Sequence, residues 1–214
     1  MTIKWYGHSC FLMTTEKGLR ILTDPCDEST GYRLSNIMAD VVTISHDHFD
    51  HNYFAAVSGE PVCINQPGEY TVGEVNIAGF PVWHDDQKGA LRGENIIYLY
   101  DVEGMRIAHL GDLGHMLEED TLRAMGKVDV LLAPVGGTYT IDHTVACAIA
   151  NATHTSVLIP MHYKTDALNM DLLGVQPLIS AAKNCRIHRL NESECTLTKE
   201  SLGEDRVLVL DYCK

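Results

Sequence analysis

The segment Val41-Val-Thr-Ile-Ser45-His46-Asp47-His48-Phe49-Asp50-His51 decides the fold. Its first five residues form a run typical of a buried central strand, and this run stops at His46. The six residues that follow contain three imidazoles and two carboxylates. The segment therefore predicts a buried strand whose end carries a cluster of polar side chains.

The spacing within this cluster indicates how it would hold cations. Residues i and i+2 of an extended segment face the same way, so His46 and His48 would grip one ion together. A turn at Phe49 would then direct Asp50 and His51 towards a second point nearby. Imidazole nitrogen and carboxylate oxygen suit zinc, although geometry rather than raw affinity selects the ion. The alternative is a polar loop that is rich in histidine by chance.

Length and composition favour one globular domain over residues 1–214. The 21% charged and 45% hydrophobic residues exclude disordered, collagen-like and coiled-coil chains. The net charge of −13 argues against nucleic acid or an anionic membrane as a partner. No secretory signal or membrane-spanning run is expected, and the seven scattered cysteines form no Cys-x-x-Cys pair, so we expect a cytoplasmic protein with free thiols.

Strands dominate the first half of the chain, and strands alternate with helices in the second. Expected strands are 2–6, 10–15, 19–24, 41–45, 62–65, 75–80, 95–101, 105–110, 128–133, 156–159 and 207–210. Expected helices are 51–57, 117–125, 144–150 and 178–183, with Asp142 capping the third and Gly126 ending the second. This order predicts two packed sheets with helices outside, a layered α/β arrangement.

Three later segments extend the histidine cluster: Trp83-His84-Asp85-Asp86, His109-Leu-Gly-Asp112-Leu-Gly and Ile159-Pro-Met-His162-Tyr-Lys. With the His-x-His-x-Asp-His string, and in this chain order, they resemble the signature of the metallo-β-lactamase superfamily. Three more segments, Gly7-His8-Ser9-Cys10-Phe11, Leu22-Thr23-Asp24-Pro25 and Pro67-Gly68-Glu69-Tyr70, resemble the branch that contains L-ascorbate-6-phosphate lactonase.

The resemblance implies a four-layer αββα sandwich with two divalent metal ions at the sheet edge, zinc first, with manganese or iron as alternatives. It implies that His46, His48 and His84 hold one ion. It also implies that Asp50, His51 and His162 hold the other. Asp112 and a hydroxide would then lie between the two ions.

The implied chemistry is hydrolysis of an ester, lactone or phosphoester bond in a small anionic molecule by the metal-bound hydroxide. Asp50 would orient the nucleophile and carry a proton to the leaving group. Lys164, next to the last histidine, would hold a substrate phosphate or carboxylate; the alternative is a solvated surface lysine. A homo-oligomer is compatible with the sequence.

Other polar residues are candidates for supporting roles. Asp24 would accept a hydrogen bond from a ligand imidazole, the alternative being a cap at the strand end. His8 lies near the same rim or is a satisfied structural histidine. His115 and Tyr139 are candidates to line the pocket.

Two other functions are compatible with these ligands. One is an iron-dependent oxidoreductase similar to persulfide dioxygenases, because ligand identity alone does not determine the metal. The other is a non-catalytic metal-binding protein of the same fold, because a fold does not dictate a function.

Overall fold

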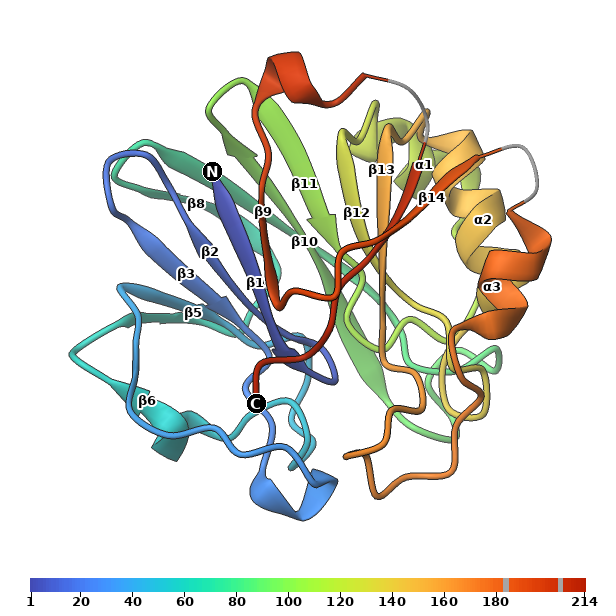
Figure 1. Ribbon diagram of the computed structural model, residues 1–214, viewed down its shortest axis with the longest axis horizontal. Helices are drawn as coiled ribbons and strands as arrows, with labels where there is room; N and C mark the ends of the chain where they lie inside the picture. The colour runs from blue at the N-terminus through green and yellow to red at the C-terminus, as the bar shows by residue number, and fades with distance from the viewer. Residues whose placement is uncertain (183–184, 204–205) are drawn as a thin grey trace.

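Two β-sheets face each other in the computed structural model, which describes residues 1–182, 185–203 and 206–214 (Figure 1). In spatial order, one sheet contains β15 (Glu194–Thr196), β1 (Thr2–Gly7), β2 (Cys10–Thr14), β3 (Arg20–Thr23), β5 (Val41–Thr43) and β7 (Val62–Ile64). The other contains β14 (Arg186–Arg189), β16 (Arg206–Val209), β13 (Val157–Met161), β12 (Val130–Pro134), β11 (Met105–His109), β10 (Glu94–Val102), β9 (Val75–Trp83) and β8 (Gly68–Val72).

The six-stranded sheet is buried on both faces, which explains why its central strands lack polar alternation. Ile21 and Val41 pack in the large core between the two sheets. Their neighbours Leu22 and Val42 point the other way and pack in a second core on the outer face. Since successive residues of a strand face opposite sides, a continuous apolar run is what such a position requires.

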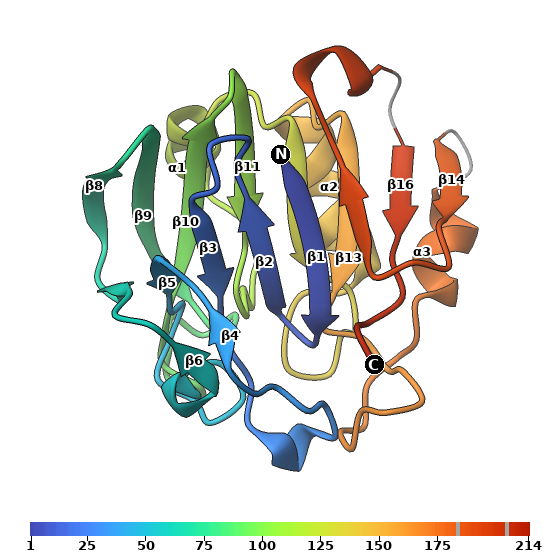
Figure 2. The ribbon, with the colours of Figure 1, turned by 60° about the vertical axis from the view of Figure 1, so that its left-hand side comes forward.

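Different structures cover the two outer faces. The helices α1 (Glu119–Met125), α2 (His143–Ala152) and α3 (Gln176–Ala181) lie on the side of the eight-stranded sheet (Figure 1). Over the six-stranded sheet, the described residues form two short 3-10 turns and the small pair β4 (Ile37–Met38) and β6 (Val57–Ser58), seen at the lower left of Figure 2. No helix in the described ranges is long and apolar enough to cross a membrane.

The strand directions bring several strand ends to one edge. β1 and β3 are each antiparallel to β2, and β5 is parallel to β3, so all three end at the same edge of their sheet (Figure 2). β9 and β11 are each antiparallel to β10, and β12 and β13 continue in parallel with β11. The residues that follow these strands are therefore gathered together although they are far apart in sequence.

Most predicted elements are present with shifted ends. Asp142 caps α2 by accepting hydrogen bonds from two backbone amides, and Gly126 ends α1 with a positive φ of 63°. Of the predicted helix 178–183, the structure has residues 176–181, and Lys183 lies outside the described residues. The edge strands β8, β14 and β15 were not predicted, because their largely exposed residues give no apolar alternation.

The predicted helix 51–57 is wrong. The structure has a 3-10 turn at Phe54–Ala56, followed directly by β6. The backbone amide of Tyr53 donates to the carbonyl of Pro25 (2.8 Å) instead of continuing a helical ladder. The segment therefore packs against a neighbouring loop, and its first residue, His51, belongs to the cluster of polar side chains at the sheet edge.

Candidate metal centre

Three histidines from two sheets form the first group of side chains. His46 and His48 follow β5, and His84 directly follows β9. Their ligand atoms lie within 4.8 Å of one another, and His46 Nε2 is 3.0 Å from His48 Nδ1. The ring of His84 lies 4.7 Å from that of His46, centroid to centroid. The sequence prediction placed these three histidines on one ion, and the structure brings them together.

A second group lies beside the first and is more deeply buried. It contains His8, Asp50, His51 and His162, whose ligand atoms also lie within 4.8 Å of one another. His8 Nε2 is 3.1 Å from Asp50 Oδ2, and the rings of His8 and His162 are 4.2 Å apart. His8 was predicted mainly as a structural histidine; the structure places it among the potential ligands. The sequence signal was its place directly after β1, which ends at the same edge as β3 and β5.

Asp112 lies between the two groups. Its Oδ2 is 3.3 Å from His84 Nε2 and 3.1 Å from His162 Nε2. Its Oδ1 is 3.2 Å from His51 Nε2. A single carboxylate therefore contacts histidines of both groups, which is the position expected of a bridging ligand.

Burial and charge set the protonation of the cluster. Burial lowers the pKa of His8 to about 4 and that of His46 to about 3, so both imidazoles are neutral at neutral pH. Burial alone would raise the pKa of Asp112, but the neighbouring His162 and His51 outweigh it and keep this pKa well below its usual value. Burial alone would lower the pKa of His51, but the carboxylates of Asp112 and Asp24 outweigh it and raise this pKa well above its usual value. The cluster thus combines neutral imidazoles at His8 and His46 with a charged pair, His51 and Asp112.

A buried carboxylate orients the histidines from behind. Asp24 Oδ2 is 2.9 Å from His51 Nδ1, and the same carboxylate accepts hydrogen bonds from the backbone amide (2.7 Å) and hydroxyl (2.6 Å) of Ser45. The Ser45 hydroxyl is also 2.9 Å from His46 Nδ1. A partner on one ring nitrogen fixes which way the other nitrogen points. Asp24 therefore lies where the sequence placed it, behind a candidate ligand.

The turn that carries Asp112 leaves no room for a side chain. Gly111 has a φ of 54°, and a Cβ built on it would lie 2.4 Å from Asn95 Oδ1 and 2.6 Å from Ser45 Cβ. Asn95 accepts a hydrogen bond from the Asp112 amide (3.0 Å) and donates to the Leu110 carbonyl (2.9 Å). Glycine at this position lets the strand end of the second sheet approach the loop of the first.

The cluster fits a transition-metal site. Among the described residues, His51 Nε2, His162 Nε2 and Asp112 Oδ1 are buried and have no hydrogen bond of good geometry. Ligand atoms at zinc bond lengths of about 2.0–2.1 Å, arranged as a tetrahedron, are separated by roughly 3.3 Å. The distances of 3.1 to 3.3 Å from Asp112 to the three histidine nitrogens match that spacing. Coordination would satisfy atoms that otherwise pay the penalty of burial.

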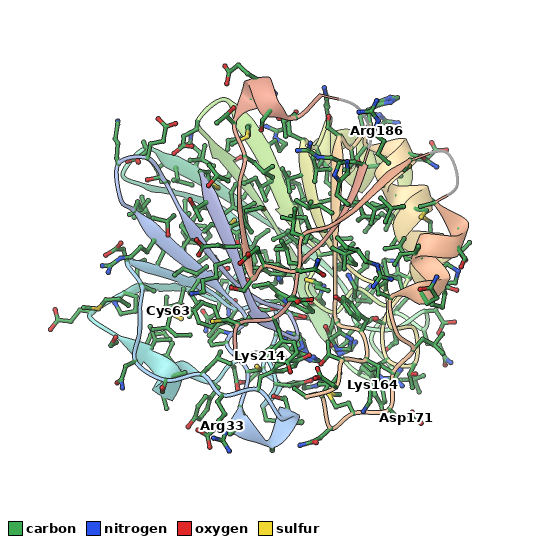
Figure 3. The ribbon with its side chains drawn as sticks, viewed as in Figure 1. Arg33, Cys63, Lys164, Asp171, Arg186 and Lys214 are labelled. Atoms are coloured by element: carbon green, nitrogen blue, oxygen red, sulfur yellow. The ribbon has the colours of Figure 1, made fainter. Side chains whose placement is uncertain are left out.

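Three other predicted residues lie apart from these groups. Lys164 lies on the segment that follows β13 (Figure 3). Its ammonium donates to the carbonyls of Leu168 and Met170, so it holds its own loop. His115 Nε2 accepts a hydrogen bond from the backbone amide of residue 83 (3.2 Å), next to His84. Tyr139 is 37% exposed and stacks under the guanidinium of Arg92, 5.5 Å from the ring centroid.

Two residues that the sequence prediction did not include are close to the centre. Asp85 follows His84, and Arg92 lines a cavity of about 560 Å³ together with His46 and His48. The available signal was the stretch 85–93, in which two adjacent aspartates precede a loop containing two glycines.

Comparisons with known proteins agree with this geometry. A family model described as a β-lactamase superfamily domain matches residues 2–162. A UPF0173 protein of Pyrococcus abyssi is 31% identical over 188 residues, covering 77% of this chain and 84% of the relative. A UPF0173 metal-dependent hydrolase of Carboxydothermus hydrogenoformans is 28% identical over 194 residues, covering 77% of this chain and 85% of the relative.

A solved structure from Thermotoga maritima, described as a candidate zinc-dependent hydrolase of the metallo-β-lactamase superfamily, covers 99% of both chains. It superimposes with a TM-score of 0.81 at 37% sequence identity. The predicted fold class is thereby confirmed. The chain belongs to the metallo-β-lactamase superfamily and, within it, to the UPF0173 family of metal-dependent hydrolases.

Proposed function

We propose that this protein hydrolyses an ester, lactone or phosphoester bond in a small anionic molecule, using two divalent metal ions held at the sheet edge. The observation that carries the proposal is the position of Asp112, which contacts histidines of both groups. A carboxylate shared in this way is suited to bridging two cations, and a single-ion site would not need it.

The ions would supply Lewis-acid chemistry: a water of lowered pKa and polarisation of the carbonyl or phosphoryl oxygen under attack. In this proposal His46, His48 and His84 hold one ion, and Asp50, His51 and His162 hold the other. Asp24 fixes the orientation of His51 by accepting its Nδ1 hydrogen bond.

Asp50 would position the attacking water and carry a proton to the leaving group. Burial alone would raise the pKa of Asp50, but the hydrogen bond with His8 and the nearby His51 outweigh this and lower it. The carboxylate is therefore ionised, and its Oδ2 can accept a hydrogen bond from the attacking water. His8 Nε2, 3.1 Å away, would keep that oxygen in place.

We further propose zinc as the metal, a single domain and a cytoplasmic location. All seven cysteines are free, which suits a reducing compartment. L-ascorbate 6-phosphate, a lactone that also carries a phosphate, is one probe of the substrate class. The acidic surface, with a net charge of −13, supports a small molecule rather than nucleic acid as the substrate.

The test is a panel of lactones, phosphodiesters and thioesters assayed on protein whose metal content has been defined by elemental analysis. Hydrolysis that requires about two equivalents of metal would support the proposal. A protein purified under reducing, chelator-free conditions that binds less than one equivalent would contradict the two-ion site.

The alternative function is an iron-dependent oxidoreductase. It would be identified by bound iron and by oxygen consumption with a thiol persulfide. A protein that binds metal but turns over neither a hydrolytic substrate nor a persulfide would instead be a metal-binding protein of this fold.

A further inference from the structure

The loop between β9 and β10 is built around one buried carboxylate. Asp85, which is 3% exposed, accepts four backbone hydrogen bonds at 2.8 to 2.9 Å. Oδ1 accepts from the amides of Gln87 and Gly89, and Oδ2 accepts from those of Leu91 and Arg92. The loop that follows the candidate ligand His84 is therefore held in one conformation without a helix or strand of its own.

The same loop is pinned at its two ends. The amide of His84 donates to the carbonyl of Gly93 (3.0 Å), which continues the pairing of β9 with β10. Gly89 has a φ of 79°, and a Cβ on it would lie 2.7 Å from the ring of Trp83. The loop thus packs back on the strand that delivers His84, so the position of Arg92 is coupled to that of the metal centre.

This loop carries two positive charges, Lys88 and Arg92, of which Arg92 lines the cavity beside the candidate metal centre and Lys88 does not. In the part of the chain that the structure describes, the guanidinium of Arg92 has no carboxylate within 4.0 Å and no side-chain hydrogen bond. It lies over the ring of Tyr139, 5.5 Å from the centroid. An aromatic face orients a guanidinium while leaving its N–H groups free for an oxyanion.

Arg92 lines the cavity next to the candidate metal centre. The volume of this cavity is about 560 Å³, and His46 and His48 form part of its wall. Among the described lining residues, Arg92 is the one arginine or lysine. The wall also contains two carboxylates: Asp47, which accepts a hydrogen bond from the side-chain amide of Asn52, and Glu94 at the start of β10. Asn65 adds a further amide to the wall.

We propose that Arg92 binds the anionic group, carboxylate or phosphate, of the substrate whose scissile bond lies at the metal centre. The proposal rests on the hydrolytic function proposed above and names the residue that selects its substrate class. A guanidinium matches a carboxylate or phosphate by two parallel hydrogen bonds. Asp85 is the positioning residue, since it fixes the backbone from which Arg92 extends.

Lys164, the cation expected from the sequence, is less suited to this role. Its ammonium already donates to two carbonyls of its own loop. Lys164 is also absent from the cavity wall described above. The anion-binding charge is therefore assigned to the β9–β10 loop.

The experiment compares wild type with Arg92→Gln, Arg92→Lys and Asp85→Asn, and uses Arg123→Gln as the matched control. Arg123 lies on α1, and its side chain is 72% exposed and paired with Asp120. Binding of inorganic phosphate to zinc-loaded protein is measured by calorimetry, and zinc content is measured on the same samples. Turnover is compared for 4-nitrophenyl hexanoate and mono-4-nitrophenyl adipate, whose acyl chains differ by a terminal carboxylate.

We expect Arg92→Gln to weaken phosphate binding at least about tenfold, with zinc content unchanged, since hydrogen bonds to charged groups are stronger than those between neutral groups. The phosphate affinity of Arg92→Lys should lie between those of wild type and Arg92→Gln, because lysine keeps the positive charge but lacks the planar guanidinium that forms two parallel hydrogen bonds. Asp85→Asn should weaken phosphate binding in the same direction. Variants that bind phosphate more weakly should also show a smaller ratio of kcat/KM for the adipate ester to kcat/KM for the hexanoate ester. Arg123→Gln should match wild type in phosphate affinity and in this ratio.

Equal phosphate affinity in wild type and Arg92→Gln would overturn the proposal, as would a loss of affinity that merely follows a loss of zinc. If phosphate binding depends on Arg92 but no ester, lactone or phosphoester is hydrolysed, the anion site stands and the proposed hydrolysis fails. If hydrolysis occurs without any preference for the anionic ester in wild type, the hydrolysis stands and the role of Arg92 fails.

Discussion

Asp112 is the residue on which both ligand groups depend. Changing Asp112 to Ala removes the contacts with His51, His84 and His162 together. Loss of a partner behind a metal ligand costs about 10- to 100-fold in affinity or activity, so loss of a bridging ligand should exceed about 100-fold in turnover. Zinc content by elemental analysis should fall below two equivalents while the far-UV circular dichroism spectrum is retained.

The matched control for this variant is Asp120→Ala, an exposed carboxylate of α1 that pairs with Arg123 on the surface. It should keep both zinc and turnover, because surface ion pairs contribute little to stability. Turnover retained in Asp112→Ala would remove this residue from the bridging position.

Asp24 acts from behind the site and should affect the metal rather than the reacting atoms. In Asp24→Asn, the amide oxygen can still accept one hydrogen bond, but the negative charge facing His51 is lost. Zinc affinity, measured by competition with a chromophoric chelator, should fall about 10- to 100-fold. An unchanged affinity would indicate that Asp24 only closes the end of β3.

The sequence predicted the ligand residues better than the residues that support them. His46, His48, Asp50 and His51 are close in the chain, so their spacing alone indicated convergence. Their role as ligands stays a prediction, although the structure gathers them within reach of one another. Asp85 escaped notice because its partners are backbone amides, which no residue type reveals.

At the scale of elements, the approach of two strand ends depends on a glycine. Gly111→Ala would cost about 1–2 kcal/mol for the left-handed backbone and about 1–3 kcal/mol more for the clash with Asn95 and Ser45. Urea unfolding should show this loss, and zinc content should fall because Asp112 is displaced.

Gly104 is the matched control for this turn. It also has a positive φ, of 71°, but a Cβ on it would meet nothing within 4 Å. Gly104→Ala should therefore lose only the conformational part, about 1–2 kcal/mol, and keep its zinc. If the two variants lost equal stability, the close packing around Gly111 would not matter.

Strands and helices could be predicted where burial imposes a regular pattern of apolar residues. They could not be predicted where contacts between distant parts of the chain determine the local structure. The core strands β5 and β13 are almost wholly apolar and were found from that pattern. The segment after His51 has the composition of a helix start, yet Asp24 and Asp112 engage His51 and the carbonyl of Pro25 engages Tyr53. Those long-range contacts, invisible in a local window, override local propensity.

For the whole molecule, the site joins the two halves of the fold. His8 follows β1 and the segment from His46 to His51 follows β5, both in the six-stranded sheet. The residues His84, Asp112 and His162 follow strands of the eight-stranded sheet. The parallel arrangement of the strands explains this convergence. In the sequence, only the family resemblance suggested that these residues converge. The order in which strands pair, and the way the two sheets face each other, cannot be read from the residues of a single strand.

Metal ions at such a site should act as a link between the sheets, so their removal should lower the melting temperature. A ligand that binds only the native state at 100 times its Kd stabilises by about 2.7 kcal/mol per site. For a chain of this length, one kcal/mol shifts Tm by about 2–4 °C, which gives roughly 5–10 °C per site. Chelated protein re-loaded with zinc should regain this difference in scanning calorimetry. Magnesium, which prefers six oxygen ligands, should not restore it. Equal melting temperatures with and without zinc would show that the two sheets are held together by their apolar core alone.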